Sequence, residues 1–212
     1  MNRKALLGAR LVAVALLFAG ISVVQNRLTA VKPEGWLKER VSYLPRSDVL
    51  RPLLLGYDAA YADYLWIKTT NYFGSHLLTD KQYPWLIQMV DMVTRLNPHF
   101  EPAYEFAGLI IPDLCNSPDA GRAILDRGIF HMGERDWKVW FYSGMIFYRY
   151  YGDRLTAAEY FARAARVDSP HSGKLARLAA AFYQKAGRTG EALGLLRFML
   201  ETSEEPRIRE VI

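Results

Sequence analysis

A small residue recurs at a nearly constant spacing through most of this 212-residue chain. Gly74, Gly108, Gly144 and Ala180 each fall late in an aromatic-rich stretch, and they are separated by 34, 36 and 36 residues. Such a spacing is typical of stacked helix pairs, in which each unit buries its apolar face against its neighbours. A small side chain is expected where the two helices of a pair cross closely, because a larger one would force their axes apart. The repeat therefore predicts about four helix pairs in one solenoid.

The distribution of apolar residues supports a helical domain. From Pro52 onward they recur at the three-and-four spacing of amphipathic helices, as Leu54, Tyr57, Tyr61 and Tyr64 illustrate. No stretch alternates apolar and polar residues for long enough to predict a strand, so the domain is expected to be all-α. The second helix of each pair is expected at residues 86–97, 119–131, 156–168 and 190–200.

The repeats resemble the tetratricopeptide repeat (TPR) family over roughly residues 57–200. The first unit has Phe73 beside Gly74 and closes at Pro98, and the second has Tyr104 and Ala107 before Gly108. The remaining family positions are filled in the last two units by Trp140, Ser143, Ala157, Phe161, Ala164, Pro170, Tyr183, Gly187, Ala192, Leu196 and Met199. Leu77 and Met132 depart from the family pattern. The resemblance implies a right-handed α-solenoid of about four TPR-like helix pairs.

The first 25 residues carry an apolar run from Leu11 to Val24 behind a basic start of Arg3, Lys4 and Arg10. Two interpretations fit this run, a cleaved signal peptide and an uncleaved helix that spans the membrane once. We expect a transmembrane helix before the solenoid, followed by a linker over residues 26–52 and the repeat domain over 53–212. The expected membrane-anchoring residues are Leu11, Val12, Val14, Leu16, Leu17, Phe18, Ile21, Val23 and Val24.

The net charge of +5 comes entirely from the N-terminal region. Residues 1–50 hold eight basic and three acidic side chains, whereas residues 51–212 hold 19 of each. This distribution favours contact with lipid headgroups and argues against nucleic acid as a partner. Together with the cost of exporting a basic tail, it predicts an inner-membrane protein whose domain lies outside the cytoplasm.

Patterns that carry catalytic chemistry are lacking in the sequence. There is no glycine-rich phosphate-binding loop, and the single cysteine, Cys115, excludes an internal disulfide. The four histidines stand near the ends of the predicted helices without the spacing of metal ligands. Glu101 and Glu105 are interpreted as carboxylates favoured by a helix start. We therefore expect a protein that is not an enzyme, with no catalytic residues, no metal site and no cofactor.

The resemblance to TPR proteins implies that the concave side of the solenoid binds another protein. The positions that face this side in the family are occupied here, among others, by Lys68, Asn71, Lys138, Phe141, Met145, Tyr148, Arg149, Lys174, Arg177 and Lys185. Basic side chains beside apolar ones suit a peptide that has an acidic or carboxylate group and an apolar anchor. The alternative is that these charges are ordinary solvated surface residues.

Two functions follow from this pattern. The first is a non-enzymatic, membrane-anchored adaptor or scaffold that mediates protein–protein interaction in an envelope or surface assembly. The second is a structural subunit of a large membrane-associated complex, such as a pilus, secretion or electron-transfer machinery, without a transferable peptide ligand. Aromatic residues exposed beyond the needs of the core would favour the second function, and the candidates are Tyr61, Trp66, Tyr150 and Tyr151.

Overall fold

The computed structural model describes residues 14, 16–17, 19–23, 27 and 47–202. The chain divides into two compact units, residues 1–43 and residues 44–212. In the described part of the second unit every regular element is a helix, and no residue there belongs to a strand. The prediction of an all-α domain is confirmed for these residues.

The second unit consists of consecutive helix pairs preceded by the short helix α2 (Ser47–Leu54). The first pair is α3 (Asp58–Leu77) and α4 (Leu86–Leu96). The second is α5 (Glu101–Leu109), with its extension α6 (Ile111–Leu114), and α7 (Pro118–Met132). The third is α8 (Trp137–Ile146), prolonged by the π-helical turn η2 (Phe147–Tyr151), and α9 (Arg154–Arg166), and the fourth is α10 (Ser172–Lys185) and α11 (Thr189–Thr202). The second helix of each pair starts and ends within two residues of its predicted bounds.

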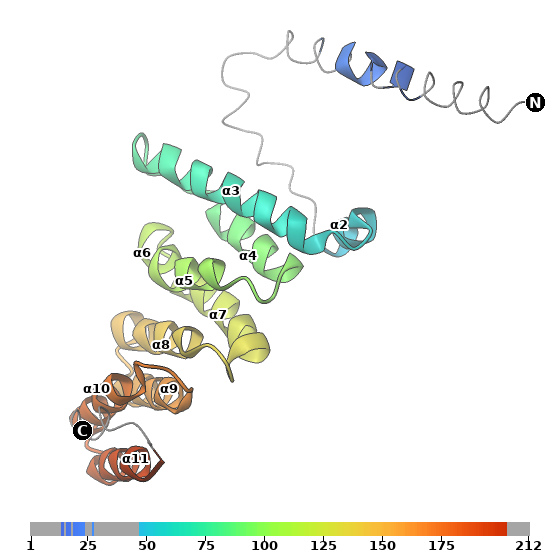
Figure 1. The fold of residues 1–212 in the computed structure, drawn as a ribbon. Coiled ribbons are helices and arrows are strands. Elements are labelled where there is room, and N and C mark those ends of the chain that lie inside the picture. Colours follow the sequence, from blue (N-terminus) through green and yellow to red (C-terminus); the bar gives the residue numbers. More distant parts are fainter. Residues whose placement is uncertain (1–13, 15, 18, 24–26, 28–46, 203–212) are drawn as a thin grey trace, which may run out of the picture. The chain divides into compact units, whose positions relative to one another are not determined.

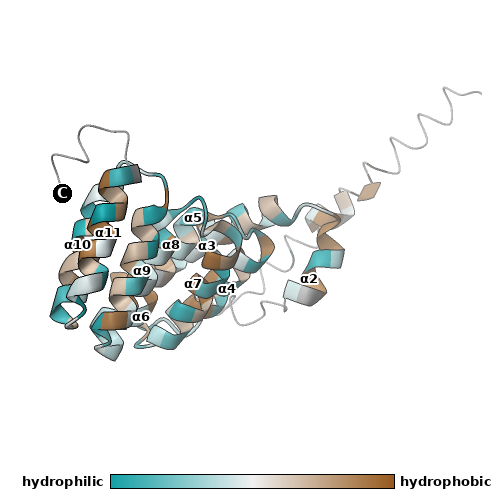
Figure 2. Cartoon of the chain, turned by 90° about the horizontal axis from the view of Figure 1, so that it is seen from below, coloured by the Kyte–Doolittle hydropathy of each residue, from teal (hydrophilic) through white to brown (hydrophobic). Residues whose placement is uncertain are grey.

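The helices of the second unit stack in chain order. Each packs against the helices that precede and follow it, and Figure 1 shows the series running from α3 to α11. Hydrophilic and hydrophobic residues lie side by side on each of α9, α10 and α11 (Figure 2), as expected for helices that bury one face only. Such an arrangement places the first helices of successive pairs next to one another.

The predicted transmembrane helix requires correction. No helix in the described part of the chain is long and apolar enough to cross a membrane. A membrane-spanning helix needs about 20 consecutive, predominantly apolar residues. Of the expected anchoring residues, Val14, Leu16, Leu17, Ile21 and Val23 are described and exposed. Leu11, Val12, Phe18 and Val24 lie outside the described residues.

The repeated small residues have different surroundings in the structure. A Cβ atom on Gly144 would lie 2.7 Å from the ring of Phe161 on α9, which is the close crossing predicted for a helix pair. A Cβ atom on Gly108 would instead meet Tyr142 of the next pair, at 2.5 Å. In the second pair the crossing uses Gly121 of α7, where a Cβ atom would lie 2.7 Å from the Ala107 carbonyl oxygen. A Cβ atom on Gly74 would meet nothing within 4 Å.

The apolar core of the last two pairs is built from small residues around Phe161. This ring is fully buried on α9, and it lies 5.7 Å from the Phe141 ring and 5.1 Å from the Phe182 ring, measured between centroids. The buried cluster contains Ala157, Ala158, Phe161, Ala162, Ala164, Ala165, Leu175, Ala176, Ala179, Phe182, Leu195 and Met199. Alanines let the helices approach closely, and the Phe161 and Phe182 rings fill the space between them.

Candidate functional site

The first helices of the pairs are connected through side chains along one side of the stack. Between α3 and α5, the rings of Trp66 and Phe73 lie 5.6 and 5.1 Å from the ring of Phe106. Lys138 of α8 reaches Glu105 of α5, and Tyr148 of η2 contacts Phe182 of α10 at 4.8 Å between ring centroids. We call this row of helices α3, α5, α8 and α10 the A-helix row.

Lys138, predicted to line a groove, is held by two carboxylates of the neighbouring helix. Its Nζ donates to Glu105 Oε1 at 2.5 Å and lies 3.8 Å from Glu101 Oε2. The hydrogen bond to Glu105 raises the pKa of Lys138. Glu101 stands in the first turn of α5, as expected for a helix-start carboxylate. The positive charge of Lys138 is therefore compensated within the fold.

Arg149 is likewise paired, at the far end of the same helix. Its guanidinium lies 3.1 Å from Asp113 Oδ2, and the Tyr150 hydroxyl donates to the other oxygen of that carboxylate. Burial, and after it the hydrogen bond to Asp113, raises the pKa of Tyr150 to about 12. The π-helical turn ends at Gly152, whose φ of +66° suits a glycine. This turn carries Tyr148, Arg149 and Tyr150, so it determines where all three side chains point.

The apolar residues predicted for the groove differ in accessibility. Phe141 and Met145 are half-buried and pack against the alanine-rich core. Tyr148 is 43% exposed and stands edge-on against Phe182. Tyr148 is therefore the residue of this set that a partner reaches without disturbing the core.

The predicted basic residues of α10 are exposed and keep their charge available. No ion pair joins Lys174 or Arg177 to an acidic residue in the described part of the chain. The Nζ of Lys185 lies 5.8 Å from the centre of the Phe182 ring, on the same helix. Positions 174, 177, 181 and 185 are separated by three and four residues, so they share one face of α10.

Lys68 and Asn71 lie apart from the other predicted groove residues. Both are exposed on α3, and the Nζ of Lys68 lies 5.5 Å from the centre of the Tyr64 ring. The main contacts of α3 are with α2 and α4, and its rings of Trp66 and Phe73 reach Phe106 of α5. Lys68 and Asn71 therefore belong to the first pair, whereas the other predicted residues lie on α8, η2 and α10 of the third and fourth pairs.

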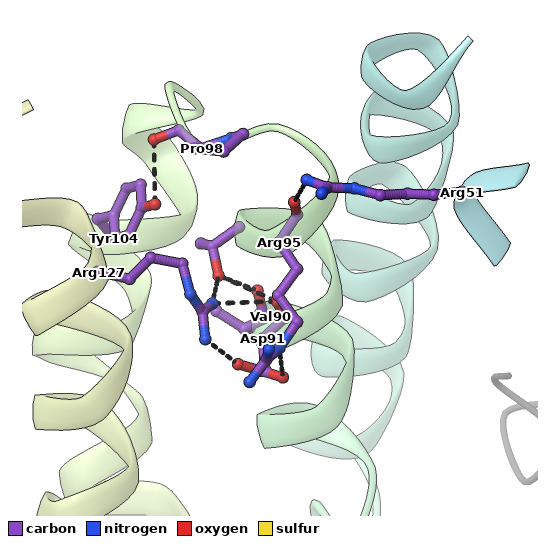
Figure 3. A network of polar contacts seen from close by, with 8 residues as sticks. Arg51, Val90, Asp91, Arg95, Pro98, Tyr104 and Arg127 are labelled. Carbon is purple, nitrogen blue, oxygen red and sulfur yellow. Dashed lines mark hydrogen bonds and ion pairs between the residues drawn. The ribbon is translucent and has the colours of Figure 1, made fainter. Parts of the chain in front are cut away.

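A polar network on the second helices was not anticipated from the sequence (Figure 3). Asp91 of α4 accepts hydrogen bonds from Arg127 of α7 and Arg95 of its own helix, both at 2.7 Å. Arg127 also donates to the Thr94 hydroxyl at 2.6 Å, and Arg51 of α2 donates to the Arg95 carbonyl oxygen at 2.6 Å. The four-residue spacing of Asp91 and Arg95 was the one available sequence signal, and it says nothing of Arg127. The network joins α2, α4 and α7, so it is structural.

The metal-binding and nucleophilic side chains of the described residues form no metal centre. No group of three or more His, Cys, Asp or Glu side chains within the described ranges is placed to hold a metal ion. Cys115 is half-buried, and burial raises the pKa of its thiol. A raised pKa lowers the fraction of reactive thiolate at neutral pH.

The comparisons with known proteins add no family. No family model matches the chain, and no curated protein matches it either. The likeness to TPR proteins therefore rests on the sequence pattern alone and stays a prediction.

Proposed function

We propose that this protein is a TPR-like adaptor that binds a protein partner through η2 and α10, at one end of the A-helix row, and catalyses no reaction itself. The observation that carries the proposal is an exposed Tyr148 that contacts Phe182 of α10, a helix that also presents exposed cations. Lys174 and Arg177 have no acidic partner among the described residues, while Lys138 and Arg149 are compensated by Glu105 and Asp113. An acidic peptide with an apolar side chain complements such a surface.

The ion pairs within the fold indicate which basic residues remain able to attract an acidic partner. A lysine or arginine that already has a carboxylate contributes little to the attraction of a second one, because its charge is neutralised locally. We therefore place recognition of acidic groups on Lys174, Arg177 and Lys185. Phe141 and Met145 support Tyr148 from the core and are not direct contacts in this proposal.

The alternative function is that of a structural subunit whose surface is permanently buried in a large complex. Exposed aromatic residues would favour this function. Trp66 is half-buried, and its ring lies 5.5 Å from Phe100 and 5.6 Å from Phe106. Tyr150 and Tyr151 donate hydrogen bonds to Asp113 and Asp119. Tyr61 is half-buried, and its ring lies 5.9 Å from the Tyr64 ring. All four candidates have a contact within the fold, and Tyr151 is still 41% exposed, so they favour neither function over the other.

Site-specific photo-crosslinking in the native cells tests the proposal. A benzophenone amino acid at position 148 should give one defined crosslinked protein, and the doubly substituted K174E/R177E chain should lose that product. The matched control places the same amino acid at Phe130, which is 83% exposed on α7, away from the A-helix row. Identical products from positions 148 and 130, or a product unaffected by K174E/R177E, would contradict the proposal.

A further inference from the structure

The outward face of α3 and its C-cap residue, Leu78, carry a stripe of six residues, which we call the α3 stripe. Its members are Ala60, Tyr64, Ile67, Asn71, Gly74 and Leu78. The intervals alternate four and three residues, which is the heptad spacing of helices that pair with another helix. The opposite face, with Ala62, Leu65, Thr69 and Tyr72, is buried within the domain. The stripe therefore lies where a further helix can reach it.

The α3 stripe is apolar except at Asn71, and all its members but the partly buried Gly74 are exposed. Tyr64, Ile67 and Leu78 are 51%, 58% and 87% exposed, and Ala60 and Asn71 are exposed as well. A soluble helix normally turns one polar face to water, and a helix that is apolar on both faces is typically buried on both. The domain itself covers only one face of α3.

Gly74 has no packing role within its own fold. A Cβ atom there would meet nothing within 4 Å, whereas one at Gly108 or Gly144 would clash with a neighbouring ring. Glycine inside a helix costs about 1 kcal/mol relative to alanine, so it needs a reason outside the helix. A small residue in the stripe lets a second helix approach closely at this point.

The charges beside the α3 stripe favour a second copy of α3 as the partner, in parallel orientation. Asp63 and Lys68 are exposed on opposite flanks of the stripe, five residues apart. In two parallel helices in register, this separation places Asp63 of each copy beside Lys68 of the other, which gives two ion pairs. An antiparallel pair centred on the same stripe would instead bring the two Lys68 side chains together. Asn71 would face its own counterpart only in the parallel arrangement, where a lone asparagine fixes the register.

We propose that α3 is a self-association surface, through which two copies of this chain pair in parallel along the α3 stripe. A 20-residue helix is about 30 Å long, and small residues occupy two of the six stripe positions. The contact therefore buries less than the roughly 800 Å² per partner of a standard interface, which makes the dimer weak and reversible. This dimer is independent of the partner-binding surface on η2 and α10.

Sedimentation velocity of the full chain between about 1 and about 300 µM tests for the dimer, because this range brackets weak interfaces. The unaltered chain should associate reversibly, and Ile67→Glu should raise the dissociation constant by about tenfold or more, since it places two carboxylates in the contact. The matched control is Leu193→Glu on α11, whose side chain is 63% exposed, and it should associate like the unaltered chain. Equal association of the two variants, or monomers of the unaltered chain at every concentration, would overturn the proposal. Circular dichroism checks that both variants keep their helix content.

Disulfide trapping and charge exchange test the parallel direction. In a C115A background, Asn71→Cys should form an intermolecular disulfide under mild oxidation, and the control Ala181→Cys on α10 should not. D63K and K68D should each fail to self-associate, because each creates like charges across the contact, while their mixture should restore pairs of opposite charge and form the heterodimer. Crosslinking at position 181 alone, or a mixture that stays monomeric, contradicts a parallel α3 pair. A monomer in which residue 71 is shielded from thiol reagents would assign the stripe to another part of the chain and also overturn the proposal.

Discussion

The first and third helix pairs differ in how they are stabilised, although each carries a glycine at the same repeat position. In the third pair, Asp136 and Asp153 cap α8 and α9 by accepting hydrogen bonds from backbone N–H groups. In the first pair, neither α3 nor α4 has a side-chain cap. Gly144 sits in a tight crossing, whereas Gly74 faces open space. The third pair is thus stabilised by contacts within the domain, whereas the first pair leaves one face of α3 open to contact with another molecule.

Both pairs join their neighbours through apolar and charged contacts. The third pair packs against the fourth around Phe161, and its Lys138 and Arg149 form ion pairs with the second pair. The first pair contacts the second through aromatic rings on α3 and through the partly exposed ion pair of Asp91 with Arg127. Apolar burial and charge pairing respond differently to salt and to truncation, so the two kinds of contact are separable by experiment.

The largest expected effect is at the centre of the third pair. Phe161→Ala should lower the free energy of unfolding by about 3–5 kcal/mol, since it removes a fully buried ring between packed helices. Ile67→Ala, at an exposed position of the first pair, should change it by less than about 0.5 kcal/mol in the monomer. Urea unfolding at low protein concentration measures both. Equal losses would remove the distinction between the two pairs.

The glycines give the next largest contrast. Gly144→Ala should destabilise the protein by about 1–3 kcal/mol, because the new methyl group meets the Phe161 ring at 2.7 Å. Gly74→Ala should instead stabilise the monomer by up to about 1 kcal/mol through helix propensity. Thermal unfolding of the two variants shows directly whether each substitution raises or lowers the stability. A destabilised G74A monomer would mean that α3 has a packing neighbour that the present fold lacks.

A smaller effect is expected at the charged junction of the first pair. Asp91→Asn should cost about 1–2 kcal/mol, since Arg127 loses the charge of its partner while some hydrogen bonding remains. Salt near 1 M, where the screening length is about 3 Å, should reduce the difference between D91N and the unaltered chain. Phe161→Ala serves as the control, because its loss should not shrink with salt. A salt-independent D91N effect would argue that the side chain acts by shape and not by charge.

The smallest effect concerns a helix cap of the third pair and depends on pH. Hydrogen bonds from the Thr156 hydroxyl and backbone N–H lower the pKa of Asp153 in the folded state. A carboxylate with a lowered folded pKa stabilises the protein above its unfolded pKa of about 3.9, and this contribution disappears as the pH falls through the lowered value. Asp153→Ala should therefore cost about 1 kcal/mol at pH 7 and progressively less in acid. Chemical unfolding at pH 7 and at pH 3 tests this, and a cost that grows in acid would contradict it.

The repeat spacing predicted the helix pairs because each pair must bury one face against the next. Gly144 was interpreted correctly as a crossing point, but Gly108 meets the following pair and Gly74 meets nothing. A glycine gives no sign in the sequence of which helix approaches it, so these differences were not predictable. The role of Gly121, in the crossing of the second pair, was missed for the same reason.

The sequence predicted which residue types lie at the candidate site. It did not predict which of the basic residues are neutralised by a carboxylate. Family positions indicated Lys138 and Arg149 as groove cations, yet Glu105 and Asp113 neutralise them from the preceding unit. These partners are more than 30 residues away in sequence, and local spacing carries no information about such pairs. Lys174 and Arg177 belong to the last described pair, where no described carboxylate reaches them.

The π-helical turn over Phe147–Tyr151 has a consequence for how related sequences are aligned. A π turn accommodates one more residue than an α turn, so an added residue can be held inside a helix and not in a loop. An alignment that permits gaps only between helices would slip by one position after residue 146. It would then assign the exposure of Tyr148 and the charge of Arg149 to the wrong positions.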